Sequence, residues 1–152
     1  MGQGDAMSAL EVIGRLDELA PPGGVLTPIA AAVSAGFPSP AQDHYRGPVD
    51  LNEHLIQDKT STFILNVSGD SMTGAGIFDG DHIIVDRSLH PHNGCVVVAI
   101  VDGELTLKTL SHSRGRVLLR AENPKFPSIA LEGEMEMTIW GVVTYNIHRH
   151  VT

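Results

Sequence analysis

Two residues of this 152-residue chain have the types that peptide-bond hydrolysis by a serine nucleophile requires. Ser71 lies in the run Val67-Ser68-Gly69-Asp70-Ser71-Met72, and Lys108 lies 37 positions later (108 − 71) in another apolar segment. A serine hydroxyl needs a base to take its proton, and a lysine amine can be that base only when it is neutral. Free lysine has a pKa near 10.4, so burial would have to lower it by about three units, at about 4 kcal/mol. The pair predicts a serine–lysine dyad with Ser71 as nucleophile and Lys108 as general base.

The turn that carries Ser71 is also suited to stabilise an oxyanion. The backbone N–H groups of Asp70 and Ser71 are expected to face the developing negative charge. Gly69 and Gly74 make a tight turn there sterically easy. We therefore predict an oxyanion hole made by the backbone of Asp70 and Ser71.

Composition limits the kinds of partner. The length and the 42% hydrophobic content suffice for one domain with a core. The net charge is −8, and the basic residues form only the loose group Arg114, Arg116 and Arg120. Because phosphate contacts supply most nucleic-acid affinity, no direct nucleic-acid binding is expected.

Other features favour a cytoplasmic protein without a cofactor. The single cysteine, Cys95, precedes three valines and is predicted to be a small buried hydrophobe in a reducing compartment. No apolar run approaches the length of a membrane span. Residues 25–35 end like a signal-peptidase site, but Pro28 and the acidic residues before them argue against a secretory signal. No metal or cofactor is expected.

The chain divides into an arm, residues 1–47, and a domain, residues 48–152. Ser8 and Glu11 are spaced as a capping box, and the apolar periodicity that follows predicts a short helix over residues 8–20. The rest of the arm is rich in Pro, Gly and small residues, which favours an extended, partly flexible backbone. Residues 51–56 are expected to form a helical turn.

The domain is predicted to be mostly β. Segments rich in β-branched residues, separated by turn formers, cover residues 62–67, 82–86, 95–101, 105–110, 116–120 and 135–148. Asp102-Gly103 is a suitable two-residue hairpin turn and places Lys108 on the returning strand. Asp79-Gly80-Asp81 predicts a second tight turn.

These residues resemble a known family, the self-cleaving LexA/UmuD peptidases, and most closely its UmuD branch. The likeness rests on Ser71-Met72, Gly76-Ile77, Asp79-Gly80-Asp81, Ile84-Val85-Asp86 and Lys108, with Gly36-Phe37-Pro38-Ser39-Pro40-Ala41 and Asp50-Leu51-Asn52 upstream. It covers roughly residues 35–110 and then thins to Gly141-Val142-Val143. The resemblance implies a mostly β, signal-peptidase-like domain that cuts its own arm.

The resemblance also implies where the cut falls. UmuD-like proteins cleave between a small residue and the glycine before the Phe-Pro-Ser-Pro run, which here is the bond Ala35–Gly36. UmuD itself would show cysteine before this glycine, whereas alanine is the LexA-like choice. The bond is therefore assigned, and its intrinsic cleavage rate is left open.

The partners follow from the same resemblance. A RecA filament on single-stranded DNA is expected to accelerate the cut, and the cut form is expected to join a UmuC-like subunit as an error-prone translesion DNA polymerase in a bacterial SOS response. Homodimers are also implied. The 35 residues before the cut leave no room for a helix-turn-helix domain, which favours a UmuD-like protein over a repressor.

Three other interpretations are open at this stage. Gly-Asp-Ser-Met also occurs in lipases and esterases, but Asp79 and His82 follow Ser71 too closely for their triad, and a β-rich domain argues against their fold. His90, His92, His148 and His150 could converge on a metal, and Asp79, Asp81 and Asp86 could suggest calcium, though turn and loop roles are favoured. A non-cleaving interaction module that regulates a polymerase is the third.

Overall fold

The structure is a computed structural model that describes residues 9–15, 25–26 and 48–151. The predicted cleavage bond Ala35–Gly36 lies outside the described residues, as does most of the predicted arm. Among the described residues, no helix is both long and apolar enough to cross a membrane.

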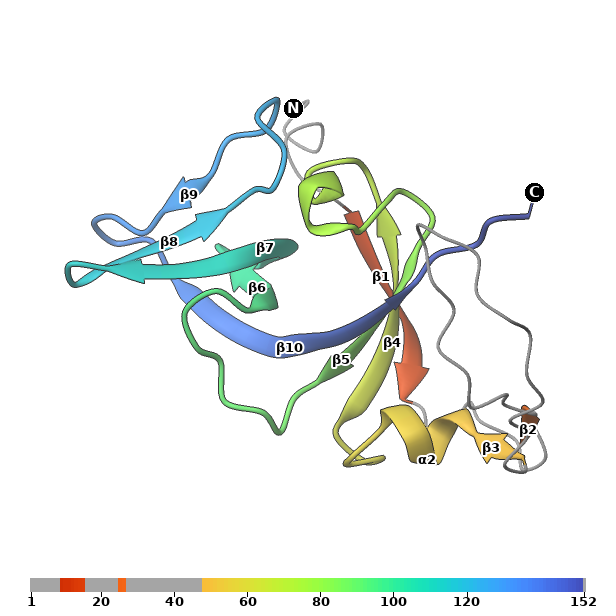
Figure 1. The fold of residues 1–152 in the computed structure, drawn as a ribbon. Coiled ribbons are helices and arrows are strands. Elements are labelled where there is room, and N and C mark those ends of the chain that lie inside the picture. The colour runs from red at the N-terminus through yellow and green to blue at the C-terminus, as the bar shows by residue number, and fades with distance from the viewer. Residues whose placement is uncertain (1–8, 16–24, 27–47, 152) are drawn as a thin grey trace.

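The described residues form one eight-stranded antiparallel sheet and a two-stranded ribbon (Figure 1). Along the large sheet the strands are β1 (Ala9–Arg15), β4 (Thr62–Ser68), β5 (His82–Asp86), β10 (Met137–Ile147), β6 (Val96–Val101), β7 (Glu104–Ser113), β8 (Arg116–Arg120) and β9 (Ile129–Ala130). The ribbon pairs β2 (Val25–Leu26) with β3 (Val49–Asp50), and the short segments are helix α2 (Leu51–Leu55) and the 3-10 turn η2 (Thr73–Ala75).

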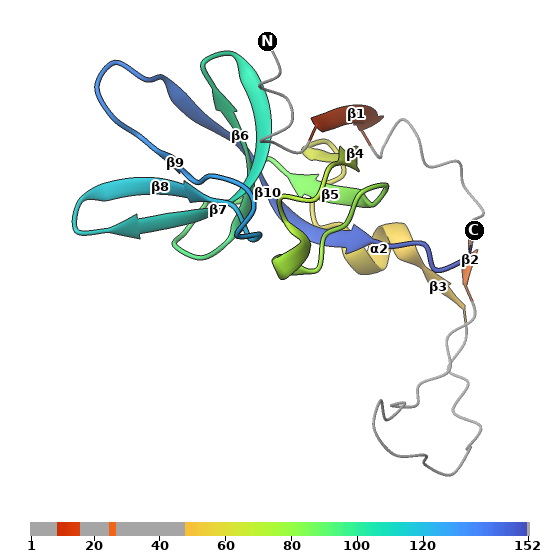
Figure 2. The same ribbon diagram turned by 90° about the horizontal axis from the view of Figure 1, so that it is seen from above.

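The long strand β10 joins the two halves of the sheet. Its first part pairs with β6, and its second part pairs with β5. Figure 2 shows β1, β4 and β5 on one side of β10, and β6 to β9 on the other. The pairing register shifts between Ile139 and Gly141, and a Cβ at Gly141 would overlap a Val85 methyl group. A glycine is therefore required where β10 changes partners.

The core consists of two apolar clusters. The first core cluster contains Leu65, Val67, Met72, Ile77, Ile83, Val85, Val98 and Leu107, and the second contains Val97, Ala99, Val101, Leu110, Leu119 and Val142. Met72 follows Ser71 and Leu107 precedes Lys108 in the chain, so residues adjoining both members of the predicted dyad pack in one cluster.

The mostly β domain is confirmed, and its turns have the predicted chemistry. Asp102 and Gly103 have φ values of 48° and 84°, which a two-residue hairpin turn requires. Gly80 has a φ of 88°, and the Asp81 N–H donates to the Phe78 carbonyl oxygen at 3.0 Å. The helical turn after residue 50 is confirmed as α2, capped by the Asp50 carboxylate.

The predicted helix over residues 8–20 is wrong, because residues 9–15 form strand β1, paired antiparallel with β4. Leu10 packs against the first core cluster, and the register shifts between Val12 and Gly14. Gly14 weakens a helix by about 1 kcal/mol relative to alanine. The free edge of β4 offers backbone partners that an isolated segment lacks, so tertiary pairing outweighs the helical periodicity.

Two smaller points also differ from expectation. Cys95 is partly rather than fully buried, and its sulfur accepts the His92 N–H at 3.3 Å. The short strand β9 and the β2–β3 ribbon were not predicted, because two-residue strands carry no detectable alternation.

Candidate active site

Ser71 lies in a loop between β4 and η2, and its side chain is buried. Gly69, at the start of this loop, has a φ of 94°, a conformation that favours glycine. Its N–H donates to the Asp79 carboxylate at 2.8 Å, which ties the start of the loop to its return. The loop is thus closed on itself around the candidate nucleophile.

The segment that follows β8 holds the same loop from outside. The Glu122 N–H donates to the Ser71 carbonyl oxygen at 2.8 Å, and the Gly74 N–H donates to the Glu122 carbonyl oxygen at 2.7 Å. The Asn123 side-chain amide donates to the Asp70 carbonyl oxygen at 2.8 Å. A Cβ at Gly74 would overlap the Glu122 carbonyl, so this close approach needs glycine. Three hydrogen bonds therefore fix residues 70–74.

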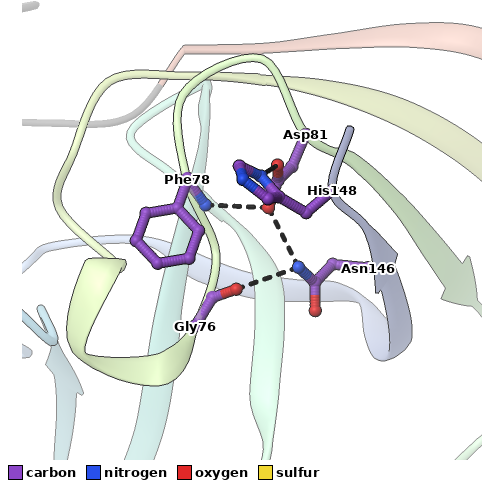
Figure 3. A network of polar contacts seen from close by, with 5 residues as sticks. All are labelled: Gly76, Phe78, Asp81, Asn146 and His148. Atoms are coloured by element: carbon purple, nitrogen blue, oxygen red, sulfur yellow. Dashed lines mark hydrogen bonds and ion pairs between the residues drawn. The ribbon is translucent and has the colours of Figure 1, made fainter. Parts of the chain in front are cut away.

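A polar network centred on Asp81 holds the far end of the loop (Figure 3). The Asn146 amide donates to the Gly76 carbonyl oxygen at 3.0 Å and to Asp81 Oδ2 at 2.9 Å, and the Phe78 N–H donates to Asp81 Oδ2 at 2.9 Å. His148 Nδ1 contacts Asp81 Oδ1. Burial alone would raise the pKa of Asp81, but the hydrogen bonds from Phe78, His148 and Asn146 outweigh it, so the pKa is lowered. An ionised carboxylate thus links β10 to the loop.

Lys108 lies on β7 and is 0% exposed. Its amine donates to the Thr106 hydroxyl at 3.0 Å and to the Leu107 carbonyl oxygen at 3.1 Å. Burial lowers the pKa of Lys108 from 10.5 to about 8. A substantial fraction of this amine is therefore neutral at mildly alkaline pH, as a general base requires.

Two sets of contacts connect the segment that carries Ser71 with the segment that carries Lys108. Met72 and Leu107 pack in the first core cluster. Thr109 of β7 pairs with Arg120 of β8, and β8 leads directly to Glu122, which is bonded to the Ser71 backbone. Residues from both sides of β10 thus pack in the cluster that adjoins Ser71 and Lys108 in the chain.

Sequence reasoning did not identify Thr106 or Asn123. The two-residue period of a strand places Thr106 on the same face of β7 as Lys108, so the pattern contained that signal. Asn123 lies 53 residues from Asp70, and no local pattern predicts a contact over that separation.

The metal interpretations gain no support. Among the described residues, no three His, Cys, Asp or Glu side chains gather as a metal site. Asp79 accepts the Gly69 N–H, and Asp86 accepts from the N–H and hydroxyl of Ser88 at 2.8 and 2.6 Å. These aspartates therefore stabilise turns. The antiparallel sheet of the described residues also differs from the α/β fold that the lipase interpretation needs.

Comparison with known proteins defines the class. The family described as Peptidase S24-like matches residues 28–144, and the chain belongs to this family, the LexA/UmuD family of self-cleaving peptidases.

Within that family the chain is UmuD-like. It is 41% identical over 119 residues to Protein MucA of Escherichia coli, covering 78% of this chain and 81% of MucA. It is 43% identical over 117 residues to Protein ImpA of Shigella flexneri, covering 76% and 78%. The LexA repressor of Bordetella petrii is 37% identical over 120 residues, which cover 79% of this chain but only 53% of that repressor. MucA and ImpA are UmuD-like SOS mutagenesis proteins.

Proposed function

We propose that this UmuD-like protein cuts its own chain at Ala35–Gly36, with Ser71 as nucleophile and Lys108 as general base. The observation that carries the proposal is the burial of Lys108, which lowers the pKa of its amine to about 8. A surface lysine would remain protonated at the pH at which a peptide bond must be attacked. Membership of a self-cleaving peptidase family supports the same chemistry.

In the proposed reaction, Lys108 moves a proton at each step. The neutral Lys108 amine takes the Ser71 hydroxyl proton as the oxygen attacks the Ala35 carbonyl carbon, and backbone N–H groups of Asp70 and Ser71 stabilise the oxyanion. The Lys108 ammonium then protonates the leaving amine of Gly36 as the Ala35–Gly36 bond breaks. Water releases the acyl group from Ser71, with Lys108 again acting as base. Thr106 and the Leu107 carbonyl oxygen orient the lysine amine between these steps.

The proposed cleavage bond belongs to the same chain as the dyad, which explains why the dyad would cut one bond. Because the bond and the dyad belong to the same chain, effective concentration replaces binding affinity, and a small, extended segment suffices as substrate. Ser71 and Lys108 are both 0% exposed, so a bond must first gain access to them. Such a dyad suits a regulated, single-turnover cut.

Membership of the family supports a proposal for the downstream role. A RecA filament on single-stranded DNA accelerates the cut, and the cut form, as a homodimer, joins a UmuC-like DNA polymerase subunit for translesion synthesis. The net charge of −8 supports action through such partners rather than by direct contact with DNA.

The test is self-cleavage of the purified full chain between about pH 6 and 10, followed by mass spectrometry. We expect a fragment that begins at Gly36, formed about tenfold faster at pH 9 than at pH 7 and levelling off above about pH 8, because only neutral Lys108 acts. Ser71→Ala and Lys108→Ala should give no fragment while keeping the fold.

A cut by Lys108→Ala would show that the base is wrong. The absence of any fragment, at alkaline pH or with RecA on single-stranded DNA, would instead support a non-cleaving interaction module.

A further inference from the structure

We propose that Asn123 is a positioning residue for the cleavage reaction, because its amide orients the peptide group that joins Asp70 to Ser71. This inference rests on the proposed function of Ser71. It adds to the dyad a third side chain, contributed by the segment after β8.

The argument begins with the peptide plane. The Asp70 carbonyl and the Ser71 N–H belong to one rigid trans peptide group, in which they point in opposite directions. The Asn123 amide donates to the Asp70 oxygen at 2.8 Å. A hydrogen bond that fixes the carbonyl direction therefore also fixes the direction of the Ser71 N–H, the proposed oxyanion donor.

Asn123 is itself held in the donating orientation. Its side-chain oxygen accepts the Lys125 N–H at 3.0 Å, and its backbone oxygen accepts the Phe126 N–H at 3.0 Å. Because the side-chain oxygen is occupied by a backbone donor, the NH₂ group is directed at Asp70. An aspartate could keep the Lys125 bond but would present an oxygen, without a hydrogen, to the Asp70 carbonyl.

Neighbouring hydrogen bonds should keep the loop folded when Asn123 is substituted. The effect of Asn123 on cleavage can therefore be measured apart from any effect on folding. The Glu122 backbone bonds to Ser71 and Gly74 involve no Asn123 atom, so they remain when its side chain changes. Lys108 is buried, and its amine donates hydrogen bonds to the Thr106 hydroxyl and the Leu107 carbonyl oxygen, neither of which involves Asn123. Loss of the Asn123 amide should therefore misdirect the Asp70–Ser71 peptide group and leave the base intact.

The test compares Asn123→Asp and Asn123→Ala with a matched control, Asn93→Ala. The Asn93 side-chain oxygen accepts the His112 N–H at 2.8 Å, so it too joins segments distant in the chain, and this bond involves no atom of residues 70–74. Full-length chains are followed for the first-order rate of appearance of the Gly36 fragment across pH. We expect both Asn123 variants to cut about 10- to 100-fold more slowly at every pH, and Asn93→Ala to stay within about twofold of the unaltered chain.

The pH at which the cleavage rate is half-maximal distinguishes a positioning role of Asn123 from a general loosening of the structure around Lys108. Positioning predicts an unchanged midpoint, because the pKa of Lys108 is set by burial. Loosening would admit water to the amine and move the midpoint upward, which would overturn the inference. Cutting by both Asn123 variants within about twofold of the unaltered chain would overturn it too.

A failure of the proposed function can be distinguished from a failure of this inference alone. If the unaltered chain yields no Gly36 fragment, the cleavage assignment and this inference fall together. If the unaltered chain cuts and the Asn123 variants cut equally well, only the inference falls. Thermal melts of all four chains identify a misfolded variant, and the neutral, smaller Asn123→Ala remains decisive if Asn123→Asp does not fold.

Discussion

At the scale of single residues, the burial that would let Lys108 act as the proposed base also has a cost in stability. The pKa of its amine is about 8 in the folded protein because of burial, against 10.5 when unperturbed. Below pH 8 both the folded and unfolded states are protonated, and the buried charge lowers the free energy of unfolding by about 3 kcal/mol. Between pH 8 and 10.5 the unfolded state binds more protons, so stability rises with pH as this cost disappears.

Replacing Lys108 with methionine should therefore stabilise the protein while abolishing cleavage. We expect Lys108→Met to raise the free energy of unfolding by about 1–3 kcal/mol at pH 7, with a smaller gain at pH 10, because the unaltered lysine is then neutral in the folded state. Urea denaturation at both pH values measures the difference. Lys125→Met, at an exposed lysine, is the control and should change stability little. Equal or lower stability of Lys108→Met at pH 7 would contradict the assignment.

At the scale of elements, strand β1 covers the edge of β4, the strand that leads to Ser71. Leu10 packs against the first core cluster, and β1 also contacts β7, which carries Lys108. The residues of β1 precede Gly36 in the chain, so cleavage at Ala35–Gly36 would leave β1 attached only by noncovalent contacts. The pairing of β1 with β4 is therefore a feature of the uncut chain that can be tested directly.

Substituting Leu10 with aspartate should detach β1 from the sheet, because it places a charge against the apolar cluster. Hydrogen exchange of Leu10→Asp should show faster exchange at those β4 amides that pair with β1, and unchanged protection at those that pair with β5. Val12→Asp is the matched control, since Val12 lies on the same strand but is 41% exposed. Full protection of the β1-facing amides in Leu10→Asp would show that Leu10 does not secure this pairing.

At the scale of the whole molecule, β10 joins two halves of one sheet, and each half carries one member of the proposed dyad. Strands β4 and β5 lie on one side of β10, and β6 and β7 lie on the other (Figure 1). Ser71 follows β4 in the chain, and Lys108 lies on β7. The side-chain amide of Asn146, near the end of β10, also donates to the Gly76 carbonyl oxygen in the segment that follows Ser71. The alignment of the site thus depends on the strand that passes between the halves.

A larger side chain at the crossing should destabilise both halves together. Gly141→Val would force a side chain into Val85 and Arg87, and we expect a loss of about 1–3 kcal/mol in the free energy of unfolding. Urea denaturation followed by fluorescence and by circular dichroism should show coincident transitions at a lower midpoint. Thr138→Val, at an exposed position of β10, is the control. Separate transitions for the two probes would show that the halves unfold independently.

Much of the fold was predictable because its signals are local. β-branched runs and turn residues predicted β5 and β8 to the residue and the other long strands of the domain to within a few residues. The hairpin at Asp102-Gly103 was predicted for the same reason, since positive φ depends on residue type. The helix expected over residues 8–20 was wrong because a distant strand edge, not local periodicity, stabilises β1.

The features of the candidate site also differ in whether local sequence signals could predict them. Residue types and local spacing predicted Ser71, Lys108 and the glycines of the loop, because nucleophiles, bases and turn formers are recognisable by their own chemistry. The bond Ala35–Gly36 came instead from the resemblance to the LexA/UmuD family, and it stays a prediction. The low pKa of Lys108 depends on burial. The hydrogen bonds of Asn123 to Asp70 and of Asn146 to Asp81 join residues that are dozens of positions apart in the chain. Burial and long-range hydrogen bonds exist only after the chain has folded. The sequence alone therefore shows that a lysine is present at position 108, and its folded surroundings lower the pKa of that lysine.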